Sequence, residues 1–347
     1  MPVSQRDAFL DSTRGLAVFL AVLIHAVRSF GYAFSPEGDL VFLLTRTATP
    51  ILLIVFGVMI ETVYLRKLRE GRALEETRQR LLHRAITCCL VYLMVGLAAL
   101  LAGKVAIGDL GQMAVSLSPV PYGQILFLYA ALLTLLACFL PVLLRWGAAA
   151  MLGLAALGWG LKWLAAPFGA DAGYGLLAFV GLGAGFAPAI LLSPLLVGFG
   201  ILIGEMLNGR RHSLWAASAA AVAALAVCLA IVLDGPGEFA RDFILRYRWH
   251  NHPLYYAYGM VAASVALTGF YLLWRRGGDP FSRLMAMLGR NALFFFVAGN
   301  VALHLMPERQ ASTAEVAVLV ALFLAALCLA TFDRQAQRSW ISWLSGG

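Results

Sequence analysis

One apolar stretch near the start of the chain, RDAFLDSTRGLAVFLAVLIHAVRS, carries the residues best suited to chemistry. Arg14 and His25 are eleven residues apart, so on an α-helix they differ by about 20° in azimuth and about 16 Å in height. Asp11 comes three residues before Arg14, and Arg28 comes three residues after His25. Four ionisable side chains therefore fall on one face of a mostly apolar helix.

Such a stripe is expensive inside a membrane unless it faces protein or a wet cavity. A histidine in it can accept a proton near neutral pH, and an arginine can hold phosphate or a polarised carbonyl. The stripe is therefore typical of a functional site. The alternative interpretation places Asp11 and Arg14 at the headgroup level and makes His25 a neutral, hydrogen-bonded core residue.

The composition excludes a soluble protein, because 61% of the 347 residues are apolar and only 13% are charged. We predict an all-α, polytopic membrane protein whose residues 1–347 form one transmembrane domain. Ten windows are apolar and long enough to span a bilayer. They lie near residues 9–30, 39–64, 82–102, 122–144, 147–166, 189–207, 214–233, 255–274, 284–306 and 313–332. The Gly-rich segment 173–188 is left outside this count, as a re-entrant loop, an interfacial piece or half of another span.

Basic residues predict the orientation of these spans. Seven of them fall between Arg66 and Arg84, and further arginines recur in alternate connections and in the C-terminal tail. By the positive-inside rule both termini are cytoplasmic, which agrees with an even number of spans. The net charge of +8 is thus explained by topology, and no nucleic-acid-binding motif accompanies it.

The cysteines indicate neither a disulfide framework nor a metal site. All five lie inside apolar windows without CxxC spacing, namely Cys88, Cys89, Cys138, Cys228 and Cys328. The first span also carries ionisable residues and lacks a small-residue cleavage site, so we expect it to be retained rather than removed as a signal peptide.

Two arginines lead directly into the third span. Residues 66–84 mix arginines and glutamates in the pattern of a short amphipathic cytoplasmic helix, and Arg80 and Arg84 stand one turn apart at its end. Two guanidinium groups on one face suit phosphate binding. Ordinary positive-inside anchoring is the alternative.

The largest polar connection on the opposite side is DGPGEFARDFILRYRWHNHP, over residues 234–253. It gathers Arg248, His250 and His252 among aromatic residues, a surface typical of sugar binding but also of a membrane-interface belt. Because no third ligand is evident, the two histidines do not predict a metal site. Asn300, deep in the ninth span, is a further substrate-binding candidate, with helix packing as its alternative role.

The opening residues resemble the acyltransferase-3 family of membrane acyltransferases, whose first span carries an arginine or lysine, ten residues, and then a histidine. Arg14 and His25 match this spacing, and Asp11 and Gly15 match the surrounding D-x-x-R-G pattern. Phe56 with Gly57, the arginines before the third span, the stretch LGRNALFFF and the ten-span count agree as well.

Two departures qualify the resemblance. Many members have an R-x-x-R element where this chain has Arg80 and Arg84, and a second histidine where it has Gly299 and Asn300. The second departure looks more like the periplasmic-glucan succinyltransferase branch (OpgC type) than the branch that acetylates O-antigen or peptidoglycan.

The resemblance implies a bacterial cytoplasmic-membrane enzyme that moves an acetyl or succinyl group from cytoplasmic acyl-CoA to a hydroxyl of an extracytoplasmic glycan. His25 would be the base, while Arg14, Arg80 and Arg84 would bind the CoA phosphates or orient the thioester. Asp11, also a substrate-binding candidate, would fix Arg14 through an i,i+3 ion pair.

Other interpretations stay open at this stage. His25 could instead carry the acyl group covalently. A different class is a small-molecule or lipid transporter that uses the Asp11, Arg14 and His25 stripe as a relay.

Overall fold

The structure is a computed structural model that is helical throughout its described part, with no strand there, as predicted. It describes residues 3–32, 40–109, 120–167, 178–182, 186–209, 213–307 and 312–344. The gaps include half of segment 173–188, namely 173–177 and 183–185, so its predicted status as a span or re-entrant loop is not decided by the described residues.

The described helices are connected mainly by short turns. In chain order they are α1 (Val3–Ser29), α2 (Leu40–Thr45), α3 (Ala48–Met59), the π-helical η1 (Ile60–Leu65), α4 (Arg66–Arg69), α5 (Leu74–Leu101), α7 (Gln124–Cys138), α8 (Leu140–Trp146), α9 (Ala148–Ala165), α11 (Pro194–Leu207), α12 (Ser213–Asp234), α13 (Pro236–Asp242), the π-helical η3 (Phe243–Tyr247), α14 (Pro253–Arg275), α15 (Pro280–Arg290), α16 (Ala292–Leu305) and α17 (Thr313–Leu344).

The chain is a multi-pass membrane protein. Within its described part, seven helical stretches are long and apolar enough to cross a bilayer, or nine if two bent pairs each count as one span. The bent pairs are α7 with α8, at 73°, and α15 with α16, at 80°. The sixth predicted window forms only the 14-residue α11, shorter than the roughly 20 residues of a straight span. The predicted count of ten is therefore not established.

The predicted amphipathic helix over 66–84 is not a separate element. α4 ends at Arg69, the chain turns at Gly71 with φ of 99°, and α5 begins at Leu74 and continues unbroken to Leu101. Glu75 and Glu76 occupy the first turn of α5, where the helix dipole favours acids. The basic segment and the third span thus share one helix.

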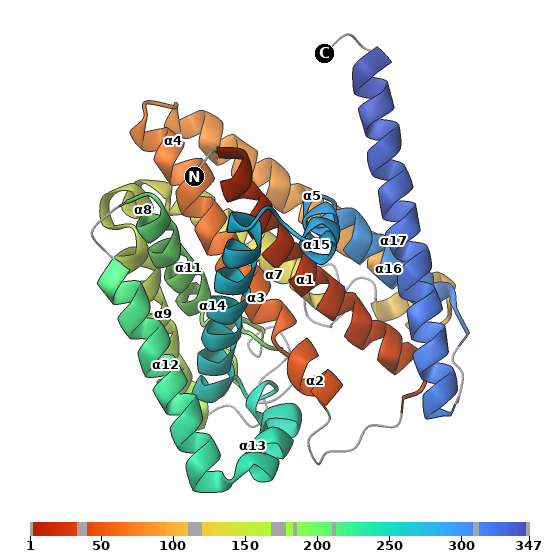
Figure 1. The fold of residues 1–347 in the computed structure, drawn as a ribbon. Coiled ribbons are helices and arrows are strands. Elements are labelled where there is room, and N and C mark those ends of the chain that lie inside the picture. Colours follow the sequence, from red (N-terminus) through yellow and green to blue (C-terminus); the bar gives the residue numbers. More distant parts are fainter. Residues whose placement is uncertain are drawn as a thin grey trace.

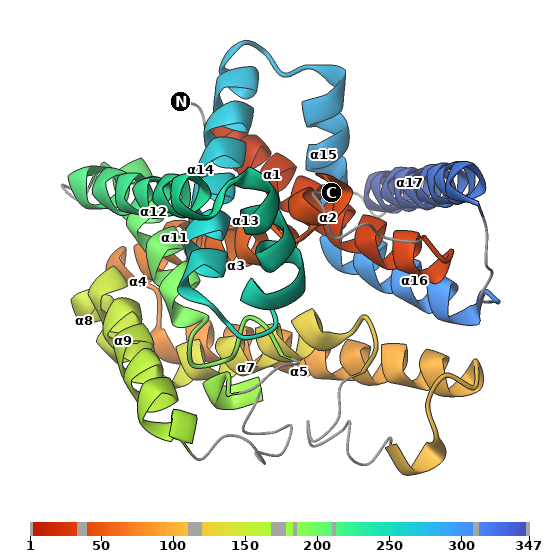
Figure 2. The ribbon, with the colours of Figure 1, turned by 90° about the horizontal axis from the view of Figure 1, so that it is seen from below.

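Helices α1 and α3 lie at the centre of the molecule. α1 packs against α3, α14, α15, α16 and α17, and Figures 1 and 2 show it running between them. In the most apolar window of Leu40–Arg69, 78% of residues are buried, against 17% for α12 at the periphery. The ionisable stripe of α1 is therefore carried by a helix that packs mainly against protein.

Glycines allow the closest helix contacts. A Cβ atom on Gly15 would collide with the Met285 carbonyl, and one on Gly289 would collide with the Asp11 carbonyl. The same occurs between α3 and α11, where a Cβ on Gly57 would strike the Val197 carbonyl. Gly57 thus permits a close contact between α3 and α11, and the α1–α15 contact is of the same kind.

Figure 1 shows where the ends of these helices lie. α1 begins and α17 ends toward one end of the molecule, where α4 also lies, while α13 lies at the opposite end. The basic segment and the aromatic-rich connection are thus at opposite ends.

Candidate active site

Arg14 is held in place by three contacts. Its Nη2 donates to Asp11 Oδ1 at 2.8 Å, its Nε donates to the Gly289 carbonyl at 2.6 Å, and its Nη1 lies 3.4 Å from Met59 Sδ. The predicted i,i+3 ion pair is therefore present. Asp11, predicted to contact substrate, lines neither cavity described below and instead fixes this arginine.

Arg14 faces a cavity of about 340 Å³, here called the Arg14 cavity. Helices α1, α3, α5, α7, α15 and α16 all contribute to its wall. Arg84 and Arg290, both exposed, line it too, so three arginines border a mostly apolar space. Such a space can take a ligand with phosphates at one end and an apolar arm.

Arg80 does not join this group. It is exposed and donates to Glu76 at 2.6 Å one turn earlier on α5, whereas Arg84 lies over the ring of Tyr64 and lines the cavity. The third arginine is Arg290, the last residue of α15, which lines the same cavity because α15 packs against α1. The sequence feature that indicates Arg290 is the stretch LGRNALFFF, in which a charged residue interrupts an apolar run.

His25 lies further along α1 and is oriented by α16. Its Nδ1 is 2.7 Å from Oδ1 of Asn300, which is fully buried. Because an amide oxygen only accepts, Nδ1 carries the proton and Nε2 keeps a free lone pair. The candidate base is thus presented in its proton-accepting form.

Tyr122 fixes the plane of the imidazole. Its ring stacks on His25 with centroids 4.4 Å apart and on His304 with centroids 5.1 Å apart. Its hydroxyl is 3.0 Å from Ser29 Oγ, and Phe296 meets His25 edge-on at 6.0 Å. The sequence analysis did not identify Tyr122, because only the fold brings residue 122 to α1.

His25 lines a second cavity of about 230 Å³, here called the His25 cavity. Three arginines from separate segments share it, namely Arg28 of α1, Arg46 between α2 and α3, and Arg248 after η3. Arg248 is a predicted substrate-binding residue. Arg46 was missed, although an arginine within an apolar window is itself a signal.

The two cavities meet end to end. Leu52 of α3, Ile125 of α7 and Phe296 of α16 line both of them. These shared apolar side chains place the arginine-lined Arg14 cavity next to the cavity that contains His25. A molecule long enough to pass them would reach from Arg14 to His25.

The two other predicted residues of the aromatic-rich connection lie outside the His25 cavity. His250 is exposed, and its carbonyl accepts from Lys162 at 2.7 Å. His252 caps α14 by accepting from the Leu254 amide and stacks on Tyr247. Burial, and then the charge of Lys162, lower the pKa of His252, which favours the neutral form that this cap requires. The His252 side chain therefore has a capping role, whereas the contact of His250 is made by its backbone carbonyl.

Asn251, between these histidines, is a structural centre that the sequence analysis missed. It is buried with φ of 49°, its Oδ1 accepts from the Ala189 amide and the Tyr256 hydroxyl, and its Nδ2 donates to the Phe186 carbonyl. It thereby joins the start of α14 to the described part of the Gly-rich segment.

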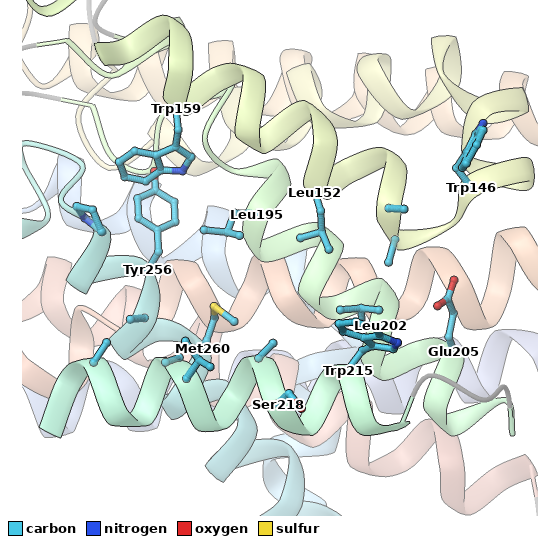
Figure 3. A pocket seen from close by; sticks show the side chains of 18 of the residues that line it. Trp146, Leu152, Trp159, Leu195, Leu202, Glu205, Trp215, Ser218, Tyr256 and Met260 are labelled. Atoms are coloured by element: carbon cyan, nitrogen blue, oxygen red, sulfur yellow. The ribbon is translucent and has the colours of Figure 1, made fainter. Parts of the chain in front are cut away.

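A third cavity has little chemistry of its own. It measures about 900 Å³ between α9, α11, α12 and α14 and is lined almost entirely by apolar side chains. Figure 3 shows Trp159 and Tyr256 toward one end, with Trp146 and Glu205 toward the other. The residue types suit hydrocarbon, and we do not place a reaction there.

Among the described residues, no cluster of three or more histidine, cysteine or acidic side chains is arranged to hold a metal ion. No protein-family model and no curated protein matches this chain. The likeness to the acyltransferase-3 family therefore rests on the residues quoted above.

Proposed function

We propose that this protein is a membrane O-acyltransferase of the bacterial cytoplasmic membrane. It moves an acetyl or succinyl group from cytoplasmic acyl-CoA to a hydroxyl of an extracytoplasmic glycan, with His25 as base. The observation that carries the proposal is the pair of cavities that meet at Leu52, Ile125 and Phe296, one with three arginines and the other with an oriented histidine.

The Arg14 cavity would receive the donor. Arg84 and Arg290 have no ion-pair partner among the described residues, so both are available to CoA phosphates. Arg14, which is held by Asp11 and Gly289, adds a fixed positive charge to the wall of the same cavity. The apolar wall suits the pantetheine arm, which would carry the thioester toward Phe296.

The His25 cavity would receive the acceptor hydroxyl. The hydroxyl oxygen bonds to the thioester carbonyl carbon while its proton passes to His25 Nε2. The carbon–sulfur bond then breaks, and the proton returns from the imidazole to the CoA thiolate. Asn300 holds the imidazole through Nδ1 and stabilises the imidazolium that forms in between.

Transfer through an acyl-histidine remains a second route for the same residues. In that route Nε2 attacks the thioester, CoA leaves, and the acceptor hydroxyl then takes the acyl group. A rapid-quench search for acyl-protein in the absence of acceptor separates the two routes.

The first experiment measures CoA binding and acyl transfer by the purified protein with acetyl-CoA and succinyl-CoA. We expect His25→Ala to bind CoA normally and to lower turnover about 10²–10⁴-fold. His83→Ala is the matched control, because His83 is exposed on α5 and lines neither cavity. Normal turnover by His25→Ala would refute the proposed base.

The transporter alternative makes a different prediction. If the aligned cavities are a permeation path, the folded protein binds no CoA, and proteoliposomes take up a small solute or lipid in a His25-dependent manner. That pair of results would replace the acyltransferase proposal.

A further inference from the structure

Three arginines line the cavity of the candidate base, and no acidic side chain lines it among the described residues. The ionisable side chains that line the described wall of the His25 cavity are His25, Arg28, Arg46, Arg248 and Tyr122. Arg28 and Arg248 are close enough to act electrostatically on both Arg46 and His25. Like charges gathered in a cavity repel one another, so this arrangement favours a bound anion.

Arg46 is the strongest sign of a missing partner. It is only 4% exposed, and its Nε and Nη1 have no hydrogen-bond partner among the described residues. Its Nη2 reaches the Ile244 carbonyl at 3.4 Å, a long hydrogen bond. Two donors of a buried guanidinium group thus remain unsatisfied beside the cavity.

Aromatic rings hold these guanidinium groups in place. Arg46 lies 5.9 Å from the Phe42 ring centroid and 5.5 Å from that of Trp249. Arg28 also lies over Phe42, and Arg248 lies over Trp249. The cations are therefore positioned by stacking, and Nε and Nη1 of Arg46 remain without a hydrogen-bond partner among the described residues.

The cavity size limits the ligand. Its volume of about 230 Å³ is below the roughly 300–1,000 Å³ of sites that enclose a drug-sized molecule. It has room for a small group at the end of a larger substrate. Guanidinium groups bind carboxylates in bidentate geometry, so a carboxylate or similar oxyanion is the matching chemistry.

The geometry points to an anion-binding subsite in the His25 cavity, formed by Arg28, Arg46 and Arg248, which holds a carboxylate-type group of one substrate beside His25. In the acyl transfer proposed above, on which this inference rests, the anion has two sources. It is either the free carboxylate of a dicarboxylic acyl chain such as succinyl, or an acidic group on the acceptor.

Succinate itself is the first probe. It should raise the thermal unfolding temperature of the purified wild-type protein, while neutral succinamide should not, and Arg46→Gln should abolish the difference. Arg246→Gln is the matched control, since Arg246 is exposed and paired with Asp242 in the same part of the chain. If Arg46→Gln does not fold, Arg248→Gln is measured in the same way and must lose the succinate effect.

Kinetic measurements identify the source of the anion. Arg46→Gln should lower the ratio of kcat/KM for succinyl-CoA to that for acetyl-CoA about tenfold if the acyl chain supplies the carboxylate. If the acceptor supplies it, the same variant lowers transfer to a uronic-acid oligosaccharide about tenfold relative to a neutral one, with either donor.

Two results would overturn the subsite. One is that neither Arg46→Gln nor Arg248→Gln changes succinate binding or these ratios. The other is that wild-type protein ignores succinate but binds it after Glu37→Gln and Asp39→Asn, two acids of the chain before α2 that lie outside the described residues. In that case the protein supplies its own counter-ions.

The outcomes for the subsite and for the enzyme are separable. Arg46-dependent succinate binding without any acyl transfer would keep the subsite and refute the acyltransferase. Acyl transfer that depends on His25 but is unchanged by Arg46→Gln and Arg248→Gln would keep the acyltransferase and refute the subsite.

Discussion

Arg84 and Arg290 come from helices far apart in sequence and line the same cavity as Arg14. Arg80, only one turn from Arg84, is instead paired with Glu76 at the surface. The fold therefore distinguishes Arg84, which lines the cavity, from Arg80, which does not, although the sequence predicts the same role for both.

Replacing these arginines tests the donor site. We expect Arg84→Gln and Arg290→Gln each to raise the Kd for CoA about tenfold, because each removes a charged donor to phosphate. Arg80→Gln serves as the control and should leave the Kd unchanged, as measured by isothermal titration in detergent. A loss of CoA affinity in Arg80→Gln alone would contradict the assignment.

Asn300 provides a second test at the residue scale. Asn300→Leu removes the acceptor that orients His25, so we expect turnover to fall about 100-fold while the Kd for CoA stays unchanged. Asn300→Asp keeps an acceptor oxygen at the same place and should recover part of this activity. If Leu and Asp substitutions are equally impaired, Asn300 has only a packing role.

The residues within α1 were predictable because helical periodicity alone relates Asp11, Arg14 and His25. The Asn300–His25 bond and the Tyr122 stack were not, since they join positions 275 and 97 residues apart whose meeting depends on the fold. For the same reason, the sequence indicates Arg248, His250 and His252 alike as substrate-binding candidates. It does not show that, of these three, Arg248 lines the His25 cavity.

At the scale of elements, the contact between α1 and α15 sets the position of Arg14. The backbones approach at Gly15 and Gly289, and the Gly289 carbonyl accepts directly from Arg14 Nε. The 80° bend after Arg290 then directs α16 toward His25. One pair of glycines therefore influences both cavities.

Gly289→Ala should disturb this contact. Its Cβ would collide with the Asp11 carbonyl, so we expect a loss of about 1–3 kcal/mol in unfolding free energy and weaker CoA binding as Arg14 shifts. Gly269→Ala is the matched control, since nothing lies within 4 Å of a Cβ at that helical position. Thermal unfolding in detergent compares them, and equal behaviour of the two variants would refute a packing role for Gly289.

At the scale of the whole molecule, hydropathy identified the helices but not their shape. Each predicted window contains a helix, yet two pairs bend sharply and α11 is short. Pro141 opens α8 just after the first bend, and Asn291 at the second donates its Nδ2 to the Met287 carbonyl. A single proline or asparagine scarcely alters the mean hydropathy of a window, so the window count does not show where helices bend.

The orientation of the molecule decides whether the proposed reaction is possible. Acyl-CoA is cytoplasmic, so the Arg14 cavity must open toward the side that carries the basic segment, and α13 must lie outside. Figure 1 places α4 and α13 at opposite ends, so one labelling experiment tests both statements.

Single cysteines at Glu75 and Glu238 report the two sides, because both side chains are exposed, at 63% and 59%. The five native cysteines are first replaced by serine or alanine. The test uses cells whose outer membrane is permeabilised and whose cytoplasmic membrane is intact. There a membrane-impermeant maleimide should label Glu238→Cys and not Glu75→Cys. Inside-out vesicles of the cytoplasmic membrane should show the opposite. Labelling of Glu75→Cys from outside would place the Arg14 cavity on the extracytoplasmic side, where there is no CoA. The donor would then have to enter through the His25 cavity.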